Sequence, residues 1–285
     1  MRRIRAVAVF PTIFTLGNLV CGFFAIVVAS RIARPGDEAF IPAPKLDSAR
    51  ELFASLDPTH NLMLCGILIF LAMVFDMFDG QVARIARVTS DFGAQLDSLC
   101  DVVSFGVAPG ILLVKMCPQF TELHREAIWC IAALYACCAA MRLARFNVEI
   151  DEDDDHSTFE GLPSPAAAAV IAGFALLSYS LRNEMNYALF QDFDWWLQRL
   201  LPLAAVAIAL LMVSRVPYPH LVTHLVRGQQ TFPQLVAIVF VLLALLTVRW
   251  YAIPLACALY ALAPPIAHAW RWSWRRRHAL LRKAG

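Results

Sequence analysis

The chain has 285 residues, of which 60% are hydrophobic and only 16% are charged. Soluble domains are roughly 45–50% apolar and about 25% charged, so this composition excludes an ordinary soluble protein. The 24 basic and 22 acidic residues leave a formal net charge of +2, which by itself indicates no particular partner. The positions of the charges along the chain are more informative than their sum.

The hydrophobic residues are gathered into long segments. A membrane-spanning helix needs about 20 mostly apolar residues, and about eight segments meet that requirement. We expect spans near 8–30, 61–82, 93–114, 126–146, 163–181, 198–214, 233–248 and 251–269. The sequence therefore predicts an all-α polytopic membrane protein.

Basic residues between the predicted spans favour one orientation in the membrane. An even number of spans places both termini on one side, and with the N-terminus inside, that side receives most of the arginines. They are Arg2, Arg3, Arg5, Arg84, Arg87, Arg142, Arg145, Arg215, Arg227, Arg271, Arg275, Arg276, Arg277 and Arg282. This distribution follows the positive-inside rule, so we expect both termini in the cytoplasm.

Four aspartates lie in or at the ends of the second and third predicted spans, where charged side chains are costly and usually functional. Asp76 and Asp79 are three residues apart, and Asp97 and Asp101 are four apart. At about 100° per residue, each pair lies on one face of its helix. Since a short connection makes the two spans antiparallel neighbours, we expect all four carboxylates to converge near the cytoplasmic ends.

Clustered carboxylates repel one another unless a cation neutralises them. Oxygen ligands favour Mg²⁺, Mn²⁺ or Ca²⁺ over zinc, and a pair of such ions is a common clamp for phosphoryl transfer. Neighbouring residues suit a phosphate ligand, because Gly80 and Gly93 permit close approach. Ala83 has a small side chain that leaves the same helix face open, and Arg84 offers a guanidinium one turn beyond Gly80.

These residues together resemble the complete signature of the CDP-alcohol phosphotransferase family. The signature reads Asp76-x-x-Asp79-Gly80-x-x-Ala83-Arg84, eight further residues, and Gly93-x-x-x-Asp97-x-x-x-Asp101. The resemblance implies that the first three aspartates hold two Mg²⁺ or Mn²⁺ ions on the CDP diphosphate. It also implies that Asp101 is the general base and that Asp101 contacts the second metal. The residues expected to line the CDP-lipid pocket are Gly80, Ala83, Arg84 and Gly93.

The same resemblance implies a domain organisation and an assembly. A membrane core of six spans would occupy residues 1–220, and residues 221–285 would add two helices and a basic cytoplasmic tail. The family also implies a homodimer surrounded by membrane lipids, and no nucleic-acid partner is expected.

Three stretches resemble membrane-embedded bacterial phosphatidylserine synthases. They are 15–26 (TLGNLVCGFFAI), 92–109 (FGAQLDSLCDVVSFGVAP), and 142–147 (RLARFN) with 159–168 (FEGLPSPAAA). This resemblance implies that a phosphatidyl group passes from CDP-diacylglycerol to the hydroxyl of L-serine, giving phosphatidylserine and CMP. The expected location is the bacterial inner membrane, with the active site on the cytoplasmic side.

Serine requires a cation for its carboxylate and a hydrogen-bond acceptor for its ammonium group. Arg142 and Arg145 lie at the cytoplasmic end of the fourth predicted span, level with the aspartates, although arginines there also serve as positive-inside anchors. Asn147, Asn18 and Ser104 are the polar partners that we expect beside them.

Two alternatives remain open from the sequence. The acceptor could instead be glycerol 3-phosphate or inositol phosphate, for which we would expect a denser basic cluster. A cation transporter also places carboxylates in a membrane, but transporters usually hold their site near the midplane between repeats. The aspartates here cluster towards one face, and Arg84 would oppose cation binding.

Overall fold

The computed structural model describes residues 9–32, 58–86, 91–118, 120, 125–149, 158–183, 187–219 and 249–284. Most of these residues are helical. The helices are α1 (Val9–Ser30), α3 (Pro58–Ala86), α4 (Asp91–Asp101), the π-helix η2 (Val102–Val107), α5 (Ala108–Met116), α7 (Arg125–Glu149), α8 (Ser164–Asn183), α9 (Tyr187–Val213) and α12 (Arg249–Ala284). The strands are β1 (Thr158–Glu160) and β2 (Pro217–Pro219).

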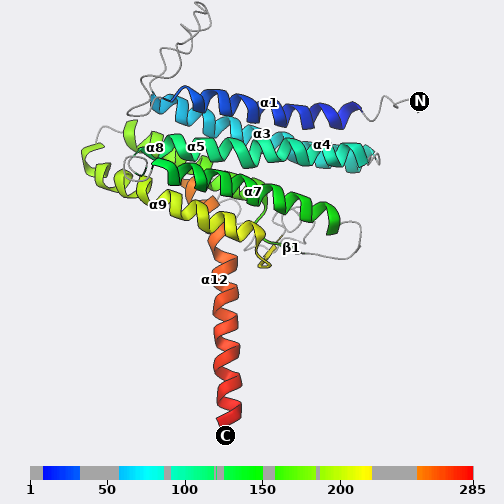
Figure 1. Cartoon of the computed structure of the whole chain (residues 1–285), viewed down its shortest axis with the longest axis vertical. Coiled ribbons are helices and arrows are strands. Elements are labelled where there is room, and N and C mark those ends of the chain that lie inside the picture. The colour runs from blue at the N-terminus through cyan, green and yellow to red at the C-terminus, as the bar shows by residue number, and fades with distance from the viewer. Residues whose placement is uncertain are drawn as a thin grey trace, which may run out of the picture.

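Helices α1, α3, α7, α8 and α9 lie side by side with the continuous rod α4–η2–α5 and form a bundle (Figure 1). Within the described residues, seven helices are long and apolar enough to cross a membrane, judged by length and composition. They correspond to seven of the predicted spans, so the predicted all-α membrane fold is confirmed. The span predicted at 233–248 lies outside the described residues.

The interior of the bundle contains many small residues beside larger ones such as Phe105 and Ile69, and many other large apolar residues are exposed on its outside. The fully buried alanines include Ala25, Ala29, Ala72, Ala108, Ala139, Ala167, Ala168, Ala172, Ala175, Ala205 and Ala209. Phe23, Phe24, Phe78 and Leu203 are exposed on the outside. Lipid removes the hydrophobic force between helices, so spans associate through the close packing that small side chains permit. This distribution is the one expected of a bundle surrounded by lipid.

The third span departs from a regular helix in its middle. Between α4 and α5 the chain forms the π-helix η2, in which the backbone N–H of Ala108 donates to the carbonyl of Val103. Ser104, Phe105 and Gly106 are buried within this wider turn. Short π-helical segments occur often at functional sites, and this one begins at the residue after Asp101.

A small antiparallel sheet, which the sequence did not predict, joins the segment before α8 to the segment after α9. Phe159 pairs with Tyr218 in its centre. Gly161 follows β1 with a φ of +82°, and a Cβ on this residue would lie 2.4 Å from the carbonyl oxygen of Met212. Only glycine fits there. The backbone N–H of Gly161 donates to Val216 at 2.9 Å, which ties the two segments together.

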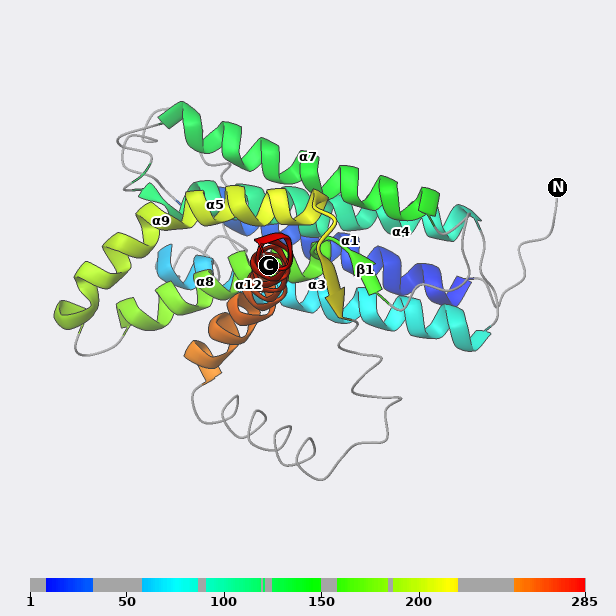
Figure 2. The same ribbon diagram turned by 90° about the horizontal axis from the view of Figure 1, so that it is seen from below.

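Helix α12 runs at a steep angle to the helices of the bundle and projects away from them (Figure 1), so it is seen along its own axis in Figure 2. It packs on α8, where a Cβ on Gly173 would lie 3.0 Å from the Cα of Pro254. Pro265 lacks an N–H, so the carbonyl of Ala261 loses its helical partner. The hydroxyl of Tyr218 donates to this carbonyl at 2.9 Å. Burial raises the pKa of Tyr218 to about 12, which keeps the proton on the donor.

We predict that Tyr218→Phe loosens α12 from the bundle. The substitution leaves a buried carbonyl without its donor, which costs about 1–3 kcal/mol. Trypsin cleavage within α12 should become faster in detergent-solubilised protein, and the melting temperature should fall. Tyr179→Phe is the matched control, because its hydroxyl pairs with His60 instead. Equal cleavage rates in the two variants would contradict the role of Tyr218.

Candidate active site

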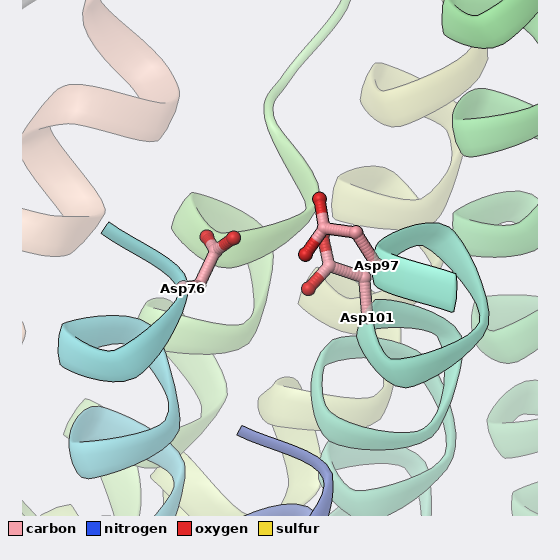
Figure 3. Close-up of side chains that lie close together, drawn as sticks. All are labelled: Asp76, Asp97 and Asp101. Atoms are coloured by element: carbon pink, nitrogen blue, oxygen red, sulfur yellow. The ribbon is translucent and has the colours of Figure 1, made fainter. Parts of the chain in front are cut away.

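The four signature aspartates come together between α3 and α4. One carboxylate oxygen each from Asp76, Asp97 and Asp101 lie within 4.8 Å of one another. Figure 3 shows the Asp76 carboxyl facing the other two across the gap between their helices. Asp79, one turn beyond Asp76, lies within hydrogen-bonding reach of Asp97. The helical spacing of each pair and the antiparallel packing of the two helices produce this convergence.

Two polar side chains of α1 contact the aspartates. The hydroxyl of Thr15 donates a hydrogen bond to Asp79 Oδ2, and Asn18 Nδ2 donates to Asp101 Oδ1 at 2.9 Å. Thr15 and Asn18 are both buried and share one face of α1, three residues apart. From the sequence, Asn18 was expected to bind the acceptor, whereas Thr15 was not identified as a site residue. The available signal was a second polar side chain at helical spacing inside the same apolar span.

The carboxylate cluster fits a divalent cation. Asp97 Oδ1 is buried and has no hydrogen-bond partner among the described residues. A buried carboxylate oxygen is costly unless a donor or a cation satisfies it. Asp76, Asp97 and Asp101 together offer an all-oxygen ligand set, which suits hard cations such as Mg²⁺ and Mn²⁺.

Of the four residues predicted to line the CDP-lipid pocket, the structure describes the surroundings of two. Gly80 is exposed at the end of the aspartate pair on α3, and Gly93 lies one turn before the aspartate pair on α4. Ala83 and Arg84 continue α3, but their side chains lie outside the described part of the structure. The two glycines thus lie beside the cluster, and the contribution of all four residues to CDP-lipid binding stays a prediction.

Arg142 is a buried cation close to the aspartates. It is 9% exposed on α7, and its Nη1 donates to the hydroxyl of Ser164 at 2.8 Å, at the first residue of α8. Its guanidinium carbon lies 5.9 Å from the centre of the Phe146 ring. Its positive charge acts on the carboxylates of Asp76 and Asp101. Arg142 is therefore a buried charge, which distinguishes it from an arginine that only anchors the helix end at the membrane surface.

The second predicted arginine has a different environment. Arg145 pairs with Glu160 of β1, and both side chains are partly open to the surroundings. The structure therefore separates two arginines that the sequence could not distinguish. Glu160 and Ser164 were not identified from the sequence as partners of the arginines.

Asn147 and Ser104 make different contacts: Asn147 of α7 contacts α4, whereas Ser104 of η2 contacts α1. Asn147 Nδ2 donates to the hydroxyl of Ser98 at 2.9 Å, directly beside Asp97 in the chain. Ser104 is buried and donates to the backbone carbonyl of Asn18 at 3.0 Å. Ser98, which lies inside the signature between two aspartates, is a further neighbour that the sequence analysis missed.

Comparison with known proteins agrees with this geometry. The sequence model of the CDP-alcohol phosphatidyltransferase family matches residues 8–211. A CDP-diacylglycerol–serine O-phosphatidyltransferase of Methanocaldococcus jannaschii is 38% identical over 154 residues, which cover 53% of this chain and 62% of that protein. The proteins of that name in Helicobacter pylori and Bacillus subtilis are 28% and 29% identical over 214 residues. These alignments cover 74% and 75% of this chain, and 72% and 92% of the relatives.

The family match covers more than two thirds of the chain and includes every signature aspartate. Members of this family depend in general on divalent metal, and the structure provides a buried aspartate cluster that suits one. The chain is a polytopic membrane protein of the CDP-alcohol phosphatidyltransferase family.

Proposed function

We propose that this protein transfers the phosphatidyl group of CDP-diacylglycerol to the hydroxyl of L-serine, giving phosphatidylserine and CMP. The convergence of Asp76, Asp97 and Asp101 within 4.8 Å supports the proposal, because it brings three aspartates of the family signature together at one partly buried place. The relatives named as serine phosphatidyltransferases support serine as the acceptor.

In this proposal all four aspartates are metal ligands, and Asp101 is also the general base. Asp76, Asp79, Asp97 and Asp101 together hold two Mg²⁺ or Mn²⁺ ions. When bound, such ions neutralise the diphosphate and stabilise charge on the leaving phosphate. The residues that border the CDP lipid are Gly80, Ala83, Arg84 and Gly93, of which the two glycines admit the phosphates closely.

Asp101 takes the proton from the serine hydroxyl while the serine oxygen attacks the phosphorus of the phosphatidyl group. The bond from that phosphorus to the CMP oxygen breaks in line with the attack, and CMP leaves. Burial of Asp101 at 6% exposure keeps water from competing as the acceptor. The reaction needs no covalent enzyme intermediate.

Arg142 is the stronger candidate for the serine carboxylate. It is buried, its charge reaches Asp76 and Asp101, and its hydrogen bond to Ser164 holds the guanidinium in place. Arg145 would contribute to the acceptor site from its edge, where it forms an ion pair with Glu160. Asn147, together with Asn18 and Ser104, supplies polar groups around the acceptor.

We also propose the setting in which this activity takes place. The similarity to bacterial serine phosphatidyltransferases supports a bacterial inner membrane. The arginine distribution supports an orientation with the termini and the active site on the cytoplasmic side. The catalytic core would be residues 1–220, which slightly exceeds the family match, and residues 221–285 would be an addition. The family resemblance supports a homodimer.

Release of CMP from CDP-diacylglycerol tests the function directly. Purified protein in detergent with Mn²⁺ or Mg²⁺ receives serine, glycerol 3-phosphate or inositol phosphate in parallel reactions. We expect release that depends on serine. Release only with another acceptor would retain the aspartate chemistry and overturn the choice of serine. If well-folded protein releases no CMP with any of the three acceptors, the cation-transporter alternative is favoured.

We predict that Asp101→Asn removes turnover but retains most CDP-lipid binding. General-base catalysis contributes about 10²–10⁴-fold, and the amide cannot accept the proton. The turnover number and the affinity for CDP-diacylglycerol should be measured on the same preparation. Turnover near that of the unchanged protein would remove Asp101 from the role of base.

Arg142→Lys should raise the Michaelis constant for serine more than Arg145→Lys does. A lysine keeps the charge but loses the planar donor pair that suits a carboxylate, and the effect should be about tenfold or more for the buried site. The Michaelis constant for CDP-diacylglycerol serves as the internal control. Equal effects on both substrates, or on expression alone, would favour an anchoring role.

A further inference from the structure

A closed set of contacts joins α1 to the junction of α4 and η2. Asn18 Nδ2 donates to Asp101 Oδ1 at 2.9 Å, and the Ser104 hydroxyl donates to the backbone carbonyl of Asn18 at 3.0 Å. Asp101 is the last residue of α4, and Ser104 lies in the π-helix that follows. The side chain and the backbone of Asn18 are therefore both held by the same four-residue stretch, 101–104.

The two segments also touch at backbone level. A Cβ added to Gly22 would lie 2.3 Å from the Ser104 hydroxyl oxygen and 2.7 Å from the Ser104 Cα. No larger residue fits at position 22 without a shift of one helix. This close approach, one turn along α1 from Asn18, fixes the distance between α1 and η2. Asn18, with 0% exposure, has little freedom to move away from Asp101.

The wide turn of η2 begins at Val102, directly after Asp101. A π-helical segment changes the angular relation between residues on its two sides. Here it presents the aspartate and, three residues later, the serine to the same neighbouring helix. The hydrogen bond from Asn18 then determines which way the plane of the Asp101 carboxyl lies.

We infer that Asn18 is a positioning residue for the proposed base, and that Ser104 and Gly22 hold Asn18 in place for this task. By occupying one oxygen of Asp101, the amide of Asn18 orients the other oxygen of the carboxyl. The inference rests on the proposed function, since it assigns Asn18 an effect that passes through Asp101. It concerns the rate of the chemical step, separately from any contact of Asn18 with the acceptor.

Asn18→Leu tests the inference, because leucine fills a similar volume without a donor. We expect kcat to fall about 100-fold, as for a misplaced reacting group. The affinities for CDP-diacylglycerol and for Mn²⁺, followed by the paramagnetic resonance of the free ion, should stay within a few-fold of those of the unchanged protein. Asn61→Leu is the matched control, because Asn61 is a buried asparagine in the first turn of α3. Its kcat should stay unchanged.

A second variant covers the case in which leucine prevents folding. Asn18→Asp keeps the shape of the side chain and replaces the donor with a charge that repels Asp101, so kcat should again fall while the protein stays folded. An unchanged kcat in either folded variant overturns the inference, whatever happens to the Michaelis constant for serine. A large loss of Mn²⁺ affinity also overturns it, because Asn18 would then shape the metal site instead of the base.

Failure of the proposed function has a different signature. An active Asp101→Asn variant would show that Asp101 is not the base. An inactive Asp101→Asn variant with a fully active Asn18→Leu variant would overturn only the positioning role of Asn18.

Discussion

The mutual repulsion of clustered carboxylates is the constraint on which this site depends. Asp76, Asp79, Asp97 and Asp101 lie together in surroundings where like charges interact far more strongly than in water. Donors from α1 and the charge of Arg142 on α7 lower that repulsion, and a divalent cation, when bound, would lower it further. Because these compensating groups come from separate helices, the site exists only when the bundle is assembled.

Close helix packing makes this compensation possible. The interior is rich in alanine, and Gly22 allows α1 to approach η2 at backbone distance. Larger residues would move Thr15 and Asn18 away from the carboxylates that they contact. The small residues that drive association in lipid therefore also set the geometry of the site.

The β1–β2 sheet connects the surroundings of the site to the C-terminal helix. Glu160 of β1 pairs with Arg145, while Tyr218 of β2 donates to a carbonyl of α12. Helix α12 lies beyond residues 8–211, which the family model matches, and it projects from the bundle at a steep angle. It is tied to the other helices through one small sheet and through its packing on α8.

The membrane fold, the seven described spans and the pairing of the aspartates follow from local patterns, namely apolar length and helical spacing. These patterns depend only on neighbouring residues, so the sequence alone determined them. The tertiary structure decided four other features. They are the donors to Asp79 and Asp101, the separate environments of Arg142 and Arg145, the π-helix after Asp101 and the steep angle of α12 to the bundle. Each depends on how segments distant in the chain approach one another, and residue types at fixed spacing do not encode that approach in a form that can be read locally.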